Sequence, residues 1–485
     1  MKKNILDRYP EYESTIGIEI HVQLKTKSKM FCSCQNKFGD RANINICPIC
    51  SGHPGTLPVL NKKAVDFAIM AGLATNCKIA KTSTFARKHY MYPDLPKNFQ
   101  ITQDDKPICY EGYVTIKTSD EEEKKIRLIR IHMEEDAGKN IHGDQNESFV
   151  DLNRAGTPLL EIVSYPDIKN AYEAKTYLRQ LHSIVQYLGI SDADMEKGSF
   201  RADTNISVKK KKDEELGTRV ELKNINSFKY IGQAIDYEVE RQITLLEENG
   251  TVLQETRLWD THNHKTLPMR KKEEAQDYRY FEEPDIPMLA IKSEQIEAIK
   301  KEIPELPDEK YIRLKNQYGV SNYEANILID QREIADFFEA SSQKCKYPKQ
   351  VSNWILRDLL GYMKEHKLKL KDLKINPEKL AELVTVIEKG IINSKVASHK
   401  VFPSMMETGK YPSIIIQEQD LKQIGSKDDL EKIILDIIEK NPDNVQQYRS
   451  GKDKLFMFFV GQAMKETKGK GNPKLIQDLL KKHLK

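Results

Sequence analysis

The sequence predicts an α+β fold in which a mixed or antiparallel sheet domain precedes an all-α region and a small helical tail. Up to about residue 290, short segments alternate apolar and polar residues, a pattern typical of half-buried strands. After the turn at 284–287, glycine becomes rarer and amphipathic patterns of helical spacing dominate. A run of strands followed by a run of helices indicates an α+β chain.

The first part of the chain holds the clearest strand patterns. Residues 16–24 alternate isoleucine, valine and leucine with Gly17, Glu19, His21 and Gln23. Residues 127–133 alternate in the same way, and 149–164 is predicted as two strands joined by a turn at 156–158. One helix is expected in this part, with an apolar face made by Tyr177, Leu178, Leu181, Ile184, Val185 and Leu188 and a stop at Gly189.

Helices are predicted for the rest of the chain after the boundary marked by Pro304 and Pro307. They are expected across 308–340, 349–366, 377–390, 393–407, 430–438, 453–467 and 473–484. The helix at 430–438 is preceded by Ser426-Lys-Asp-Asp429, which resembles a capping box, and is ended by Asn441-Pro442.

Composition narrows the class of protein. The chain has 485 residues, which is enough for several domains, and 31% of them are charged. No apolar run approaches the roughly 18 residues that span a bilayer, so no membrane association is expected. The first ten residues lack an apolar core, so a secretory signal is not expected. Of the seven cysteines, Cys77, Cys109 and Cys345 are scattered, which argues against a disulfide framework and favours a cytoplasmic location.

Four cysteines are grouped as Cys32-Ser-Cys34 and Cys47-Pro-Ile-Cys50. The segment between the pairs is rich in turn-forming residues, so the pairs can be brought together. This spacing is close to that of zinc ribbons, in which Zn²⁺ is bound by four thiolates. The sequence therefore predicts a structural zinc site, and the alternative is two chance pairs of buried or free thiols.

A second candidate centre is rich in carboxylates. Glu19 and His21 lie two residues apart on a predicted strand and therefore share a face. Glu135 and Glu161 each lie at or beside a strand end, and a set of three carboxylates and one imidazole favours Mg²⁺ or Mn²⁺. Strand alternation sends Glu134 and Glu135 to opposite faces, so at most one of them is expected to bind the metal. Taken singly, each glutamate is more typical of an ion pair or an exposed strand position.

The end of the chain is basic. Residues 465–485 hold seven lysines and two acidic residues, a balance of +5 against +4 for the whole chain. Such an end suggests an anionic partner such as nucleic acid, with Lys465, Lys468, Lys470 and Lys474 as candidate contacts. The alternative is a solvated helix face.

Several motifs together resemble one family closely, the GatB subunit of the tRNA-dependent amidotransferase that makes Gln-tRNA(Gln) or Asn-tRNA(Asn). The matching stretches are Ile-Gly-Ile-Glu-Ile-His (16–21), Tyr-Pro-Asp-Leu-Pro-Lys (92–97), His-Met-Glu-Glu-Asp-Ala-Gly-Lys (132–139), Asp-Leu-Asn-Arg-Ala-Gly-Thr-Pro-Leu-Leu-Glu-Ile-Val-Ser (151–164), Glu-Leu-Lys-Asn-Ile-Asn-Ser-Phe (221–228) and Asp-Tyr-Arg-Tyr-Phe (277–281). One departure is Glu282, where the family usually has proline, and it leaves the conformation of the local turn open.

The resemblance implies a domain organisation and a set of site residues. A cradle domain is expected at 1–292, a helical domain at 293–408 and a tRNA-binding helical tail at 409–485. Carried over by motif, the family's catalytic metal site falls on Glu19, His21, Glu135 and Glu161. Zinc at Cys32, Cys34, Cys47 and Cys50 would then be structural.

The implied activity is that of a carbon–nitrogen ligase with glutamine as amido-nitrogen donor. ATP phosphorylates the side-chain carboxylate of mischarged Glu-tRNA(Gln) or Asp-tRNA(Asn), and ammonia displaces the phosphate, with Mg²⁺ or Mn²⁺ offsetting charge on phosphate oxygens. Ammonia would come from a separate amidase (glutaminase) subunit, and a small third subunit would complete a heterotrimer. The chain alone is expected to be inactive.

Two other interpretations fit parts of the sequence. One is a non-catalytic, zinc-containing tRNA-binding scaffold, which leaves Glu19, His21, Glu135 and Glu161 unexplained. The other is the related archaeal subunit specific for tRNA(Gln), which carries a large inserted domain for which 485 residues leave no room. The motifs are the same whether tRNA(Gln), tRNA(Asn) or both are substrates.

Overall fold

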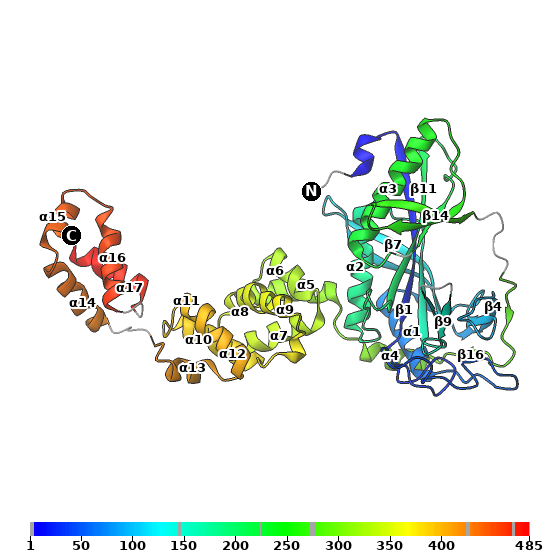
Figure 1. The fold of residues 1–485 in the computed structure, drawn as a ribbon, viewed down its shortest axis with the longest axis horizontal. Coiled ribbons are helices and arrows are strands. Elements are labelled where there is room, and N and C mark those ends of the chain that lie inside the picture. Colours follow the sequence, from blue (N-terminus) through cyan, green and yellow to red (C-terminus); the bar gives the residue numbers. More distant parts are fainter. Residues whose placement is uncertain are drawn as a thin grey trace. The chain divides into compact units, whose positions relative to one another are not determined.

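The computed structural model describes residues 4–143, 147–223, 225–271, 278–422, 427–467 and 471–484. The chain forms two compact units, Met1–Pro307 and Asp308–Lys485. The first contains the sheets and the second is helical (Figure 1). The predicted α+β class is therefore confirmed. In the described residues no helix is both long and apolar enough to cross a membrane.

A nine-stranded sheet is the centre of the first unit, with strand order β14-β13-β12-β11-β1-β10-β7-β6-β2. All neighbours are antiparallel except β12 and β13, so the sheet is mixed. The strands are β1 (Tyr12–Gln23), β2 (Lys78–Ile79), β6 (Cys109–Lys117), β7 (Glu123–Glu135), β10 (Pro158–Ser164), β11 (Phe200–Lys210), β12 (Val220–Lys223), β13 (Glu255–Asp260) and β14 (Lys265–Lys271).

Alternation along β1 decides which side chains enter the core. Ile16, Ile18 and Ile20 are at most 1% exposed, whereas Glu19 and His21 point to the other face of the strand. The predicted strands at 16–24 and 127–133 thus both belong to the large sheet.

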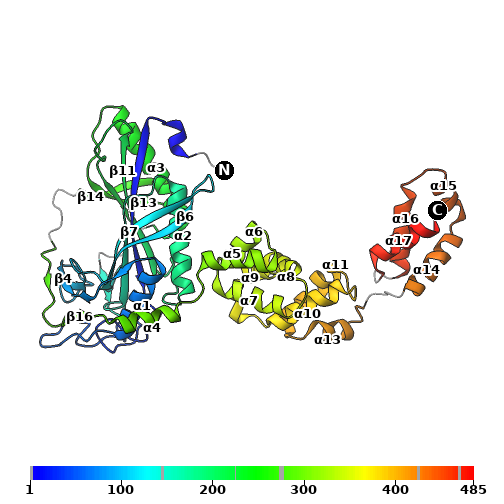
Figure 2. The same ribbon diagram turned by 180° about the vertical axis from the view of Figure 1, so that it is seen from behind.

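Helices cover the apolar face of this sheet. The expected helix is α2 (Ala171–Tyr187), which packs on β6 and on α3 (Phe228–Glu247), while α3 packs on β11 (Figures 1 and 2). The sequence patterns did not identify α3 or α1 (Lys62–Ala74). The start of α1 had a readable signal, because the side chain of Asn61 caps it by accepting hydrogen bonds from the backbone of Lys63 and Ala64.

Short strands form three smaller sheets in the same unit. They are β15 (Phe281–Glu282), β4 (Ala86–His89) and β5 (Phe99–Thr102); β16 (Leu289–Ala290) and β3 (Thr82–Ser83); and β8 (Lys139–His142) and β9 (Ser148–Asp151). The departure at Glu282 therefore lies in a strand paired with β4. Arg87 on β4 binds Glu283 through two hydrogen bonds of 2.7 and 2.8 Å, which fixes this segment.

The second unit consists of helices around two apolar cores. They are α5 (Pro307–Tyr318), α6 (Asn322–Ile329), α7 (Arg332–Gln343), α8 (Pro348–Trp354), α9 (Leu360–His366), α10 (Pro377–Glu388), α11 (Ser394–Val396), α12 (Phe402–Thr408), α13 (Pro412–Glu418), α14 (Lys427–Glu439), α15 (Pro442–Arg449), α16 (Leu455–Glu466) and α17 (Pro473–His483), with π-helical turns at Ile355–Leu359 and Ala397–Val401. The capping box expected at 426–429 begins outside the described residues.

Packing moves both expected domain boundaries toward the C-terminus. Helix α4 (Ser293–Glu302) contributes Ile299 to the core of the sheet unit, so this unit extends to Pro307 instead of ending at 292. Ile415 on α13 and Leu421 belong to the first helical core, whereas the second helical core starts at Leu430. The tail core thus begins after 421 and not at 409.

Candidate functional site

Cross-strand pairing brings four polar side chains into one row on the face of the large sheet opposite its apolar core. His132 on β7 lies opposite Glu161 on β10, Glu161 lies opposite His21 on β1, and His21 lies opposite Arg201 on β11. Directly opposed residues on antiparallel strands share a face. Both imidazole Nε2 atoms lie 3.4 Å from the same carboxylate oxygen, Oε2 of Glu161.

Glu134 completes this cluster, because it lies two residues after His132 on the same face of β7. One ligand atom from each of His132, Glu134 and Glu161 lies within 4.8 Å of the others, and all three residues are buried. Nδ1 of His132 has no hydrogen-bond partner, and the only partner of Oε2 of Glu134 among the described residues is the ammonium group of Lys88, 3.5 Å away. A buried polar atom without a hydrogen-bond partner is costly, and carboxylates beside imidazoles offer the oxygen and nitrogen ligands that a divalent cation such as Mn²⁺ takes. We call His21, His132, Glu134 and Glu161 the acid–imidazole cluster.

Electrostatics favour the charged forms of Glu161 and His21. Burial opposes ionisation of Glu161, but His132 and His21 outweigh it and hold the pKa of Glu161 well below its usual range. Burial also disfavours the charged form of His21, but the hydrogen bond with Glu161 outweighs this effect and raises the pKa of the imidazole.

Two neighbours hold the carboxylate of Glu134. Nζ of Lys88 lies 3.5 Å from its Oε2 atom. Burial works against the charge of Lys88, but the negative charge of Glu134 prevails and raises the pKa of the lysine. Gln100 donates a hydrogen bond of 3.0 Å to the other oxygen of Glu134. The carboxylate is thereby fixed beside Glu161.

The structure brings together only part of the predicted ligand set. His21 and Glu161 meet, and Glu19 lies two residues from His21 on the same face, where Asn205 donates a 3.0 Å hydrogen bond to it. Burial and the nearby carboxylates of Glu161 and Glu221 raise the pKa of Glu19.

Glu135 lies apart from this cluster. It forms an ion pair with Lys97 and accepts a 3.0 Å hydrogen bond from the backbone of Ile101. The expected separation of Glu134 and Glu135 is present, but Glu134 and not Glu135 lies beside Glu161. His132 was missed, although period-two alternation places it on the face of Glu134.

The cysteine quartet forms a second centre. The four sulfur atoms lie within 4.8 Å of one another, and Cys50 Sγ lies 4.0 Å from Cys34 Sγ and 3.9 Å from Cys47 Sγ. A tetrahedron with Zn–S bonds of about 2.3 Å separates its sulfurs by about 3.8 Å, so the arrangement fits zinc. A hydrogen bond with Cys32 and the backbone N–H of Cys47 contribute to lowering the pKa of Cys50 to about 4.

The loop that holds the cysteines is tied to the motif at 151–164. Asn43 donates to the carbonyl of Val150 at 2.9 Å and accepts from the backbone of Leu152 at 2.8 Å. Asn153 accepts from the backbone of Asn45 at 2.9 Å. The loop follows β1 and leads to α1, where the backbone N–H of Asn61 donates a 2.8 Å hydrogen bond to the carbonyl of Met30 (Figures 1 and 2).

Asp136 anchors the other side of the same motif. It is buried and accepts hydrogen bonds from Gln23 at 2.7 Å and Arg201 at 2.9 Å. Arg154 donates to the carbonyls of Ala137 and Gly138 at 3.0 and 2.5 Å. The polar residues of the motifs at 132–139 and 151–158 therefore hold together the loop after β7 and the loop before β10.

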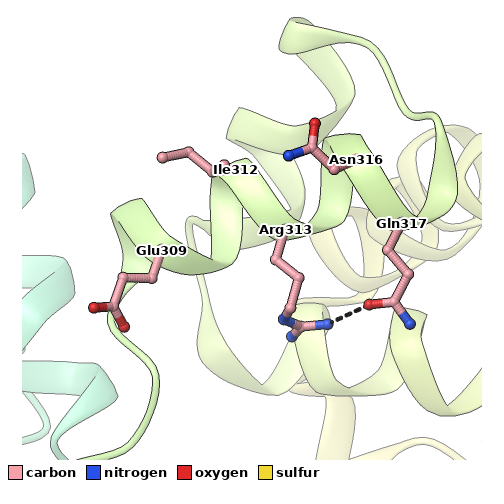
Figure 3. A pocket seen from close by; sticks show the side chains of 5 residues that line it. All are labelled: Glu309, Ile312, Arg313, Asn316 and Gln317. Carbon is pink, nitrogen blue, oxygen red and sulfur yellow. Dashed lines mark hydrogen bonds between the residues drawn. The ribbon is translucent and has the colours of Figure 1, made fainter.

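Two surface hollows differ in their relation to the cluster. One, of about 290 Å³, is lined by Glu19, Asn205 and Arg219 among others and lies on the polar face of the sheet. The other lies on α5 in the helical unit (Figure 3), where Arg313 donates a 2.9 Å hydrogen bond to Gln317. All of its lining residues come from one helix, so it has no part in the cluster.

The predicted tRNA contacts are only partly described. Lys465 is exposed in the last turn of α16. Lys468 and Lys470 lie outside the described residues, and Lys474 lies in α17 with its side chain outside the description.

Comparison with known proteins agrees with the motifs. The model of the family described as "GatB/GatE catalytic domain" matches residues 14–297, and that described as "GatB domain" matches residues 336–484. Three proteins, each named as the B subunit of an aspartyl/glutamyl-tRNA(Asn/Gln) amidotransferase, are similar over 98% of this chain. They come from Persephonella marina (50% identity, 100% of its length), Chlorobium phaeobacteroides (48%, 99%) and Geotalea daltonii (49%, 99%). The chain therefore belongs to the GatB family of aspartyl/glutamyl-tRNA(Asn/Gln) amidotransferase subunits.

Proposed function

We propose that this chain is the component of a tRNA-dependent amidotransferase that activates and amidates the mischarged amino acid. The substrates are Glu-tRNA(Gln), Asp-tRNA(Asn) or both, and the products are Gln-tRNA(Gln) and Asn-tRNA(Asn). The observation that carries the proposal is the buried acid–imidazole cluster, which lies within the part of the chain that matches the family's catalytic domain.

The proposed reaction has two steps. An oxygen of the substrate carboxylate attacks the γ-phosphorus of ATP, so that ADP leaves and an acyl phosphate forms. The lone pair of ammonia then attacks the acyl carbon, phosphate leaves, and the nitrogen loses a proton to give the amide. Both steps build negative charge on phosphate oxygens, which cations must offset.

The residues of this chain are suited to hold a cation there. His21, His132, Glu134 and Glu161 would bind a divalent ion, which would supply Lewis-acid stabilisation of phosphate charge. Gln100 fixes one oxygen of Glu134, and Lys88 adds a half-buried positive charge beside the other. Glu19 flanks the cluster, whereas Glu135 lies on the other face of β7, where Lys97 holds its carboxylate.

Partners follow from the same proposal. Ammonia is supplied by hydrolysis of glutamine on an amidase subunit, and a small third subunit completes a heterotrimer. The cluster argues against a scaffold without chemistry, because tRNA binding alone gives no reason to bury His132, Glu134 and Glu161 side by side.

The test is an amidation assay on the complex co-expressed with its amidase and small subunits. Glu-tRNA(Gln) and Asp-tRNA(Asn) are supplied separately with glutamine and ATP, and amide formation and ADP release are both measured. The proposal predicts one ADP for each amide formed with at least one of the two tRNAs. Binding of tRNA without ADP release or amide formation would support the scaffold instead.

The tail can be tested in the same complex. We propose that the core starting at Leu430 binds tRNA, because residues 465–485 carry a balance of +5. Truncation after residue 422 should raise KM for aminoacyl-tRNA far more than KM for ATP, and should reduce the salt dependence of tRNA binding. Unchanged tRNA affinity after truncation would assign these lysines to a solvated helix face.

A further inference from the structure

A lysine side chain is buried directly against the cysteine centre. Lys29 is 0% exposed, and its Nζ lies 3.5 Å from Sγ of Cys50 and 3.2 Å from the carbonyl oxygen of Leu152. Among the described residues no carboxylate forms an ion pair with it. A buried ammonium group is costly unless an anion lies beside it. Cys50 is therefore the partner that the surroundings of Lys29 offer.

The charge of a zinc–thiolate group explains this position. Zn²⁺ bound by four thiolates has a net charge of −2, and one lysine ammonium offsets half of it. Cys32 and Cys50 are the buried members of the quartet, so solvent screens their side of the centre least. Donors to metal-binding atoms generally tune metal affinity and fix the orientation of the ligands.

The same lysine contacts the motif at 151–164. Nζ of Lys29 donates to the carbonyl of Leu152. The backbone N–H of the next residue, Met30, donates a 2.7 Å hydrogen bond to the carbonyl of Gly156. Gly156 has a φ of +84°, and a Cβ there would lie 3.4 Å from Cδ of Lys29, 3.5 Å from Cβ of Cys50 and 3.7 Å from Oε2 of Glu135. The cysteine centre, Lys29 and Glu135 thus meet at one glycine.

We propose that Lys29 is a positioning residue for the zinc centre. Its ammonium group offsets the charge of the zinc–thiolate group through Cys50 and fastens that group to the carbonyl of Leu152. The cysteine centre and the 151–164 motif are thereby held as one body. This inference requires zinc at the cysteines but does not depend on the phosphoryl-transfer chemistry.

The test compares Lys29→Met with Lys27→Met in the full-length chain. Lys27 is exposed and lies two residues earlier, so it controls for loss of a lysine from the same segment. Zinc content of the unmutated protein is measured first, and zinc affinity is then measured by competition with a chelator. Lys29→Met should weaken zinc binding by about 10- to 100-fold, the usual effect of losing an outer partner of a metal ligand, whereas Lys27→Met should not.

Zinc removal supplies the second readout. Zinc removal should lower the melting temperature of the unmutated protein more than that of Lys29→Met. In the unmutated protein, loss of the zinc–thiolate group leaves the buried ammonium of Lys29 without its counter-charge, and the variant has no such ammonium. If Lys29→Met is insoluble, Lys29→Gln, which keeps an N–H donor for Leu152 but not the charge, should lose the same zinc affinity.

Three results would overturn the inference in distinguishable ways. Absence of zinc in the unmutated protein would refute the zinc site itself. Zinc affinity of the Lys29 variants equal to that of Lys27→Met would refute the role of Lys29 alone. If Lys29→Met lowers the melting temperature by the same amount in the presence and in the absence of zinc, Lys29 stabilises the fold only through its hydrogen bond to the carbonyl of Leu152. Amidation activity is not needed for any of these readouts.

Discussion

The two candidate metal centres of this chain are assembled in different ways. The cysteine centre takes all its ligands from one loop between Cys32 and Cys50. The acid–imidazole cluster instead takes one or two side chains from each of β1, β7 and β10, which are far apart in sequence. A centre built within one loop is determined by the spacing of its ligands in the sequence. A centre built across a sheet is determined by the register in which its strands pair.

The centres also differ in the atoms that they offer. Four thiolates without an open position are typical of zinc sites that stabilise structure. The acid–imidazole cluster offers carboxylates and imidazoles, with Lys88 beside Glu134 and Nδ1 of His132 left without a hydrogen-bond partner. Loss of the first centre should therefore reduce mainly stability, and loss of the second mainly catalysis.

The largest effect is expected for Glu161→Gln, because Glu161 contacts both imidazoles of the cluster. Amidation by the complex should fall at least about 100-fold, the upper end for partners outside the first coordination shell. Glu123→Gln on the exposed start of β7 is the matched control. Wild-type amidation by Glu161→Gln would place the chemistry elsewhere.

A smaller but still large effect is expected for His132→Gln. This residue has an unpartnered Nδ1 and lies opposite Glu161, so its loss should lower amidation by about 10- to 100-fold. Glutamine hydrolysis by the partner amidase should persist, which separates the two activities. An unchanged amidation rate would show that the cluster does not use the β7 imidazole.

The smallest effect on catalysis is expected for Cys47→Ser. Losing one zinc ligand should lower the melting temperature by on the order of 5 °C, which corresponds to about 2 kcal/mol in a large domain. Metal analysis should show loss of zinc from the protein. Some amidation should remain below the melting temperature. Complete loss of amidation with an unchanged melting temperature would show that the cysteine centre acts in catalysis. The two centres would then not differ in role.

Part of this architecture was predictable from sequence. Alternation at 16–24 predicted which face of β1 is buried, and paired cysteines predicted which sulfurs meet, because both signals are local. The motif match predicted the family. The position of α4 was not predictable, because its amphipathic pattern is the same whichever core it packs on. Its contacts in the structure assign it to the sheet unit: Ile299 lies in that core, and Gln295 donates a 3.0 Å hydrogen bond to Asp66 on α1.

The ligand set was only partly predictable for a related reason. Alternation separated Glu134 from Glu135, but it could not say which of the two faces also carries Glu161. That depends on the register in which His132 lies opposite Glu161, and register is a property of two strands together. The partners of Lys29 were hidden for the same reason, since Cys50 and Leu152 are distant in sequence.

We propose that the acid–imidazole cluster, with Glu134 as its β7 carboxylate, holds the divalent cation. The most direct measurement is Mn²⁺ affinity, determined by electron paramagnetic resonance on the complex, for the unmutated protein, Glu134→Gln and Glu135→Gln. The account predicts that Glu134→Gln weakens Mn²⁺ binding by about tenfold or more. Glu135→Gln, whose carboxylate is held by Lys97, should change it little. A greater loss for Glu135→Gln than for Glu134→Gln would contradict the account and place the metal on the other face of β7.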